Sequence, residues 1–284
     1  MFAGPRSDLD WAGAARRDRL REGFPVIRFV HHFNYANGVS REVGDAWYRN
    51  QHVPQVRDLP GVTGYLSWPQ IDVDIPYPSP GAPTPHDQFV RRSEVRFDNL
   101  ERAVAAVMGN PQLWEPSDEG VPGFREFECM FLREDPQYDL LRDAPPEQYK
   151  YMTLPLRWPN GEPEVDLSAE IFMNSYAINY PEDIPLAIGE DWYVGHHNRE
   201  GKQLPGMKHY KTWLTIPVPE NGGALKPNKW LRLTELGMSP EAYKATMVNE
   251  ESRIRFTPSP YGRVIGDWLN ISIKLDVVDD LLTP

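Results

Sequence analysis

Short segments of the chain alternate apolar and polar residues, and the segments between them carry apolar residues at helical spacing. Alternation predicts β-strands, four in each half of the chain, at residues 25–35, 62–68, 89–97, 123–132, 169–176, 207–216, 230–236 and 268–277. Helices are predicted at residues 8–21, 41–58, 100–108, 185–203 and from 240 onward, and a proline-rich loop at 69–85. Each half therefore has the order β-α-β-β-α-β, the ferredoxin-like arrangement.

Two of the predicted helices have a specific start signal. Asp98 has the spacing of an N-cap, with Glu101 three residues later. Ser239 is followed by Pro240, which suits the first helical position.

The order of elements repeats because the sequence itself is duplicated. Eight of the 22 positions from Trp47 to Trp68 are identical to the positions 145 residues later, and the matches include tryptophan, tyrosine and histidine. The shared pattern is Trp-Tyr-x-x-x-His, then Leu-Pro-Gly, then a tyrosine and a tryptophan. The repeat predicts four parts, an N-terminal arm (1–23), a first repeat (24–133), a linker (134–164) and a second repeat (165–284).

Each predicted repeat leaves one face of its sheet uncovered by its helices. A second copy of the same sheet in the same chain can cover that face, which predicts an α+β barrel with the helices outside. In the third predicted strand, Arg92, Glu94 and Arg96 share the face that points inward. Because unpaired buried charges are costly, the interior is expected to be a salt-bridged lattice, a water-accessible cavity, or both.

The duplicated motif resembles the EthD-like proteins of the dimeric α/β-barrel superfamily, and the resemblance covers most of the chain. It implies that one chain forms the barrel that family members usually form from two. The superfamily includes cofactor-free oxygenases, lactone isomerases, polyketide cyclases, dehydratases and lyases, and some haem-binding branches, so the fold does not fix the reaction.

Composition narrows the partners and the compartment. A net charge of −11 without a basic stripe argues against nucleic acid and anionic membranes as partners. Cys129 is the single cysteine, residues 1–23 lack the apolar core of a signal peptide, and no apolar run reaches membrane-spanning length. We therefore expect a cytoplasmic protein, and the sequence leaves open whether the barrel pairs further as a homodimer.

The strongest catalytic candidates are the motif histidines, His52 and His197. A neutral imidazole can accept or donate a proton, and Tyr48 and Tyr193, one turn earlier, can orient it. The alternative is that each histidine ties its helix to the next loop.

A second histidine candidate lies in the first predicted strand, at His31-His32. Alternation divides that strand into two faces, with Arg28, Val30 and His32 against Phe29, His31 and Phe33. His32 is therefore expected to line the barrel. The matching strand of the second repeat is expected to carry Met173, Asn174 and Ser175 there, without histidine, which predicts one working cavity in the first repeat.

Glu94 is the carboxylate candidate, either as a base in a partly dry site or as an ion-pair partner of the flanking arginines. The residues expected to bind substrate are Arg28, Trp47, Tyr65, Arg92, Tyr193 and Tyr210. No metal-ligand spacing or nucleotide motif is present in the sequence, so no cofactor is expected, although haem stays open.

These features together predict a cofactor-independent lyase of aromatic-compound catabolism. A histidine would move a proton on a small hydrophobic, aromatic substrate while a C–C or C–O bond breaks. The alternatives are a cofactor-independent oxygenase, an isomerase or cyclase of a polyketide-like compound, and a non-catalytic carrier of a hydrophobic metabolite.

Overall fold

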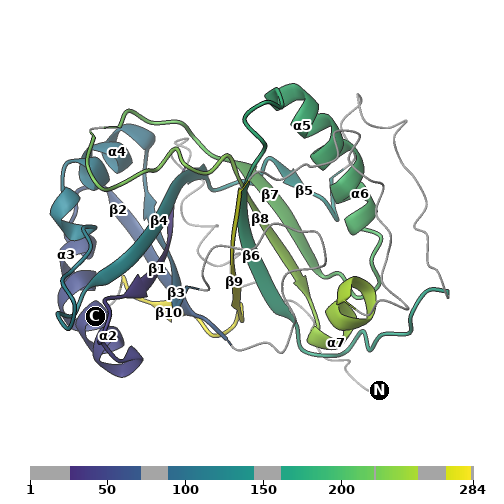
Figure 1. Cartoon of the computed structure of the whole chain (residues 1–284), viewed down its shortest axis with the longest axis horizontal. Helices are drawn as coiled ribbons and strands as arrows, with labels where there is room; N and C mark the ends of the chain where they lie inside the picture. Colours follow the sequence, from purple (N-terminus) through teal and green to yellow (C-terminus); the bar gives the residue numbers. More distant parts are fainter. Residues whose placement is uncertain (1–25, 72–88, 144–160, 221, 249–266, 283–284) are drawn as a thin grey trace, which may run out of the picture.

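The computed structural model describes residues 26–71, 89–143, 161–220, 222–248 and 267–282, and the fold is α+β with two five-stranded antiparallel sheets. Figure 1 shows the sheets meeting at the middle of the molecule, with helices α2–α4 outside one sheet and α5–α7 outside the other. The predicted helix at 8–21 and most of the loop at 69–85 lie outside the described residues.

The first sheet has the strand order β10-β2-β3-β1-β4. Its four long strands are β1 (Ile27–Tyr35), β2 (Val62–Pro69), β3 (Arg91–Phe97) and β4 (Phe124–Arg133). The helices are α2 (Arg41–Trp47), α3 (Val53–Arg57) and α4 (Leu100–Met108), followed by the short 3₁₀ helix η2 (Pro111–Leu113). The predicted boundaries hold within a few residues because apolar alternation and turn residues mark each strand.

The second sheet has the order β5-β7-β8-β6-β9, which matches the first sheet strand for strand. Its long strands are β6 (Phe172–Asn179), β7 (His209–Leu214), β8 (Arg232–Met238) and β9 (Asp267–Ile273). The helices are α5 (Leu186–Trp192), α6 (Asn198–Gly201) and α7 (Pro240–Tyr243), and α7 continues as the π-helix η5 (Lys244–Val248).

Two sequence predictions need correction here. The N-cap of α4 is Asn99, whose side chain accepts from the backbone N–H of Arg102, and Asp98 instead accepts from the Asn99 and Arg102 side chains. Strand β6 begins at Phe172, three residues later than predicted, so Tyr176 and Ala177 stand in the places of His31 and His32. Strand β6 therefore lacks histidine, as predicted, but the residues in the places of His31 and His32 are not Met173, Asn174 and Ser175.

Each motif helix contains one π turn between two α segments. In the first unit the turn is η1 (Tyr48–His52), closed by the N–H of Val53 donating to the carbonyl of Tyr48. In the second unit it is η4 (Tyr193–His197), closed in the same way by Asn198 and Tyr193. The wider turn brings the tyrosine and histidine rings of the motif face to face, with centroids 5.4 Å apart in the first unit and 5.6 Å in the second.

Each sheet takes one short edge strand from the far end of the other unit. β5 (Tyr138–Asp139), which follows the first unit, pairs with β7, and β10 (Asp279–Asp280), at the end of the second, pairs with β2. The exchange is symmetric in detail, since Leu140 donates to the Tyr210 carbonyl and Leu281 donates to the Tyr65 carbonyl.

A third apolar core lies between the two sheets, in addition to one core under the helices of each unit. It takes side chains from both units and includes Val30, Trp68, Met130, Leu132, Met173, Trp213, Trp230, Leu233 and Ile271. The two inner sheet faces therefore shelter each other, as the duplication predicts.

No helix within the described ranges combines the length and the apolar character that a membrane-spanning segment needs.

Candidate functional site

The predicted site residues of the first repeat fall on opposite faces of the first sheet. Arg28, His32, Arg92 and Glu94 belong to the inner face, whereas Tyr48, His52 and Tyr65 belong to the outer core under the helices. The sheet itself separates the two groups. The structure therefore brings the candidates together in two sets rather than in one site.

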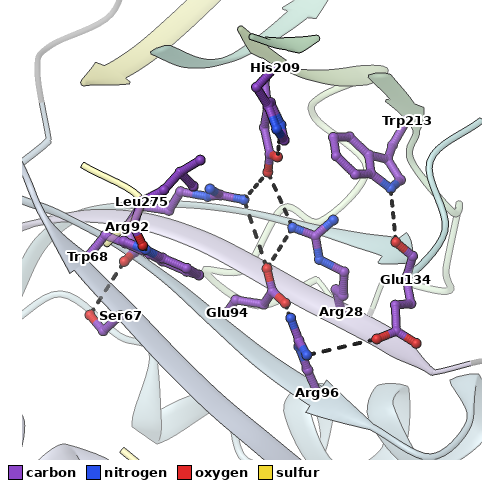
Figure 2. A network of polar contacts seen from close by, with 11 residues as sticks. Arg28, Ser67, Trp68, Arg92, Glu94, Arg96, Glu134, His209, Trp213 and Leu275 are labelled. Atoms are coloured by element: carbon purple, nitrogen blue, oxygen red, sulfur yellow. Dashed lines mark hydrogen bonds and ion pairs between the residues drawn. The ribbon is translucent and has the colours of Figure 1, made fainter. Parts of the chain in front are cut away.

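The inner set is an ion-pair lattice that joins the two units (Figure 2). Arg28 lies 2.6 Å from Glu94 and 3.3 Å from Glu235, and Arg92 lies 2.5 Å from Glu235. His209 lies 3.1 Å from the other oxygen of Glu235. This arrangement is the ion-pair alternative for Glu94.

The lattice keeps Glu94 ionised. Burial alone would raise the pKa of Glu94, but Arg28 and Arg96 lower it to about 2. A carboxylate with so low a pKa is a poor proton acceptor at neutral pH. Arg28 and Arg92 are likewise engaged with carboxylates, so they hold the two units together.

His32 also lies on the inner face, directly across from Arg92 in the pairing of β1 with β3. Burial, with the charge of Arg92 beside it, lowers the pKa of His32 to about 3. Neither ring nitrogen has a partner among the described residues. His32 is separated by the sheet from the motif helix, so it does not join His52.

The outer face of the first unit holds a different group, which we call the histidine cluster. It consists of two buried imidazoles and the aromatic rings around them, namely His31, His52, Phe29, Phe33, Trp47, Tyr48, Trp114, Phe124 and Phe127. The centroid of the Trp114 ring is 5.5 Å from His31 and 5.2 Å from His52. Trp114 thus touches both histidines.

Three ring nitrogens in the histidine cluster have no hydrogen-bond partner in the described part of the chain. They are Nδ1 and Nε2 of His31 and Nε2 of His52. Burial lowers the pKa of His52 to about 3. Burial, with His52 and His32 nearby, holds the pKa of His31 well below its usual value against an opposing contribution from the Phe29 backbone, whose contact with the ring falls short of hydrogen-bond geometry. Both imidazoles are therefore neutral at pH 7 and each offers a nitrogen that can accept a hydrogen bond.

The motif tyrosine of the first unit serves to fix the helix on the sheet. The hydroxyl of Tyr48 is 2.8 Å from that of Tyr65 and 2.7 Å from that of Ser93. Burial raises the pKa of Tyr48, so the phenol stays protonated. Its bonds leave it stacked on His52 and not hydrogen-bonded to it.

The second unit closes the same position with a tyrosine. Tyr176 occupies the place of His31, and Tyr193 donates to its hydroxyl at 3.1 Å. Tyr210 donates to Asn198, and His197 stacks on Trp192 with centroids 4.9 Å apart. Burial lowers the pKa of His197 to about 4. The two units therefore share the motif but differ at the residue that faces it from the first strand.

Sequence reasoning assigned His31 to the face away from the barrel and did not make it a site residue. It also gave no role to Trp114, Phe124 and Phe127, which complete the histidine cluster. The alternation of the first strand already placed His31 with Phe29 and Phe33. The contact with His52 could not be seen, because it requires the packing of the helix on the sheet.

Haem does not fit at His52 as the rings stand. The Trp47, Tyr48, Trp114 and Phe124 rings all have centroids within 5.5 Å of the imidazole, where a porphyrin would need open, flat space. Among the described side chains, no three histidine, cysteine or acidic residues are grouped as a metal site.

Comparison with known proteins gives likeness of architecture only. No protein-family model matches the chain, and no curated protein matches its sequence. An anthrone oxidase-like protein is similar in structure, with 8% identity, a TM-score of 0.48, and coverage of 92% of this chain and 94% of that one. A chlorite dismutase from Candidatus Nitrospira defluvii, in complex with imidazole, has 12% identity, a TM-score of 0.38, and coverage of 91% and 94%. Similarities this slight do not bear on function.

Proposed function

We propose that the first unit binds a small aromatic hydroxy compound between its sheet and the motif helix, and that His52 moves a proton on it in a lyase-type reaction. The observation that supports this proposal is the pair of buried neutral imidazoles, His31 and His52, which together have three ring nitrogens without a hydrogen-bond partner among the described residues. Leaving a buried acceptor unpaired costs about 1–3 kcal/mol, and a ligand hydroxyl that donates to it removes this cost. The surrounding rings suit a flat aromatic ligand.

Entry of such a ligand requires some rings of the histidine cluster to part. Trp114 is the natural one to move, because it follows the short helix η2 in an irregular segment and lies in neither a strand nor an α-helix. Segments of this kind open at lower free energy than the strands and helices around them. Displacement of Trp114 would uncover His31 and His52 together.

A carbon–carbon cleavage of the retro-aldol type balances with this chain's own groups. The substrate hydroxyl gives its proton to His52, the hydroxyl carbon becomes a carbonyl, and the neighbouring C–C bond breaks. The electron pair left on the other carbon then takes the proton back from His52. Burial disfavours the imidazolium, which favours this return, and His31 accepts a second hydrogen bond that orients the substrate. Proton transfer by a placed group contributes about 10²- to 10⁴-fold.

A second candidate function is that of a non-catalytic carrier. It rests on the low pKa of His52, near 3, which makes the imidazole a weak base. A carrier of an aromatic hydroxy compound needs only hydrogen-bond acceptors in an aromatic surround. Such a protein would bind the ligand at the same nitrogens and leave it unchanged.

Binding of 2-naphthol, followed by tryptophan fluorescence, tests the site. We expect His52→Phe and His31→Tyr, the latter copying the second unit, to weaken binding about tenfold or more through loss of a buried acceptor. The matched variant His197→Phe in the second unit should bind as the wild type does. Equal affinity in wild type, His52→Phe and His31→Tyr would contradict the site.

Release of benzaldehyde from 4-hydroxy-4-phenylbutan-2-one, an aromatic β-hydroxy ketone, separates the enzyme from the carrier. If the protein is a lyase, we expect release of benzaldehyde that depends on His52 and does not require oxygen. Binding of the ketone at the histidine cluster without release would favour the carrier.

A further inference from the structure

Arginine burial in this protein follows a rule with one exception. The described residues include five buried arginines, and four of them bind carboxylates. Arg28 and Arg92 do so in the lattice, Arg91 binds Asp45 and Asp279, and Arg232 binds Glu190. The fifth, Arg199 in α6, is only 5% exposed and has no acidic partner in the described parts of the chain. A buried charge without a counter-charge is costly, so its presence needs an explanation.

The guanidinium of Arg199 presents two buried nitrogens, Nε and Nη1, without a hydrogen-bond acceptor. Its electrostatic surroundings agree with this. Burial lowers the pKa of Arg199, and no carboxylate of the described residues raises it. By contrast, Glu94 and Glu235 raise the pKa of Arg28 against the effect of burial.

Other unpartnered nitrogens lie on the same helical segment of the second unit. They are Nε1 of Trp192, Nδ1 of His196 and Nδ2 of Asn198. The Oδ1 of Asn198 accepts from Tyr210 at 2.8 Å, which fixes the amide so that Nδ2 is left as a donor. Trp192 itself stacks on His197 across the π turn, and Arg199 lies in the last turn of the same segment. The segment therefore carries several buried nitrogens without partners in addition to the charge of Arg199.

The first unit has none of this chemistry at the matching positions, except for its tryptophan. Val53 and Pro54 stand where the second unit has Asn198 and Arg199, and exposed Gln51 stands for His196. Because helix geometry is shared, the donors are a property of the second unit's sequence and are not needed to form the motif helix.

We propose that Arg199 forms a binding site for a small oxyanion in the second unit. The planar fork of arginine matches the two oxygens of a carboxylate, and a phosphate presents the same oxygen chemistry. An oxyanion supplies both the missing counter-charge and acceptors for the unpartnered nitrogens. This site is independent of the histidine cluster, which lies in the first unit.

Calorimetric titration of the full chain with sodium benzoate and with inorganic phosphate, in chloride of matched ionic strength, tests the proposal. We expect at least one of the two to bind with saturation and to raise the thermal midpoint by mass action. The preferred anion then identifies the source as a carboxylate or a phosphate. Arg199→Gln should weaken binding by about tenfold or more, since charge-assisted bonds are lost. Lys202→Gln removes the same charge one turn away and should leave affinity unchanged.

Arg199→Lys covers the case in which Arg199→Gln fails to fold. It keeps the charge but loses the fork, and we expect weaker benzoate binding with the thermal midpoint of the free protein retained. The proposal is overturned if neither anion binds the wild type. It is also overturned if every Arg199 variant that folds binds the anion as tightly as Lys202→Gln does.

Discussion

Buried polar side chains in this protein are of two kinds, and the difference is energetic. Each arginine and glutamate of the inner lattice has an opposite charge beside it, as in the 2.6 Å contact of Arg28 with Glu94. The imidazoles of His31 and His52 and the guanidinium of Arg199 are buried without partners in the described structure. A group of the second kind lowers stability unless something from outside satisfies it.

Replacement of His31 by phenylalanine should therefore stabilise the protein. The ring lies among Phe29, Phe33 and Phe127, and its two nitrogens have no partner with hydrogen-bond geometry within the described ranges. We expect the free energy of unfolding in urea to rise by about 1 kcal/mol, because an unsatisfied polar group is replaced by an apolar ring of similar shape.

Tyr48→Phe is the matched comparison, since it removes a satisfied polar group from the same cluster. It breaks the contacts with Tyr65 and Ser93 and should lower the free energy of unfolding by about 1–3 kcal/mol. A loss of stability in His31→Phe as large as in Tyr48→Phe would show that the imidazole is satisfied in the free protein.

Stability should fall as the pH drops from 7 to 5. His32 and His52 titrate near 6.5 when unfolded and near 3 when folded, so the unfolded state binds more protons between these values. Their contribution is complete above pH 6.5 and is lost toward pH 3, at about 1.4 kcal/mol per pH unit for each histidine. Glu94 acts in the same direction between 4.5 and about 2.

Urea midpoints at pH 7 and pH 5 measure this dependence, and His52→Phe should flatten it. Equal midpoints for the wild type at both pH values would mean that the histidines are not buried as neutral groups.

At the residue scale, the sequence identified His52, Tyr48 and Glu94 as candidates but could not assign their surroundings. The ion-pair alternative for Glu94 could be predicted, because strand alternation places Arg92 and Arg96 on the same face as Glu94. The meeting of His31 with His52 depends on how a helix rests on a sheet, which no spacing along the chain encodes.

At the scale of elements, both units contain the motif helix with a π turn at the same place. Pro54 lacks an N–H and would crowd the carbonyl of Asn50 in a regular helix, which a widened turn relieves. The second unit nevertheless keeps its π turn with Arg199 at the same place, so proline is not the cause. The shared cause we infer is the stacking of the histidine ring on the tyrosine and tryptophan before it.

The approach of this helix to the sheet depends on Gly44. A Cβ added there would lie 2.3 Å from the Tyr35 ring, and one at the matching Gly189 would lie 2.2 Å from Tyr180. Gly44→Ala should therefore lower the free energy of unfolding by about 2 kcal/mol, because overpacking outweighs a helix-propensity gain of about 1 kcal/mol.

Chemical denaturation followed by circular dichroism measures the effect, with Gln51→Ala on the exposed side of the same helix as the control. If Gly44→Ala were as stable as Gln51→Ala, the helix would have to sit farther from the strand than it does here.

At the scale of the whole molecule, the two units are tied together from both sides. Their inner faces share an apolar core and the ion-pair lattice, and their edge strands are exchanged. Asp279, carried by β10 from the end of the second unit, binds the buried Arg91 and the half-exposed Arg49 of the first, each at 2.8 Å. In the second sheet, Arg232 instead binds Gln137, the residue before β5.

Asp279→Asn should thus loosen the first sheet, although the residue belongs to the second half of the sequence. Arg91 loses one of two carboxylates, and we expect a cost of about 1 kcal/mol because Asp279 is partly exposed. Hydrogen exchange should quicken in β2 more than in β7. Asp276→Asn, at an exposed position nearby, is the control, and equal exchange in both variants would contradict the role of the strand exchange.

The sequence by itself determined the repeated β-α-β-β-α-β order, the motif helices and the facing of the two sheets. These follow from local periodicity, turn residues and the need of each half to cover an apolar face. They are properties of short stretches of chain, and because the sequence is duplicated each of them appears in both halves.

Only the tertiary structure decided which side chains meet. The exchanged edge strands are two residues long and leave no periodic signal, and the division of candidates between an inner lattice and an outer histidine cluster depends on contacts between distant elements. The unmatched charge of Arg199 is also visible only once burial is known, because an arginine in a helix is ordinarily solvated.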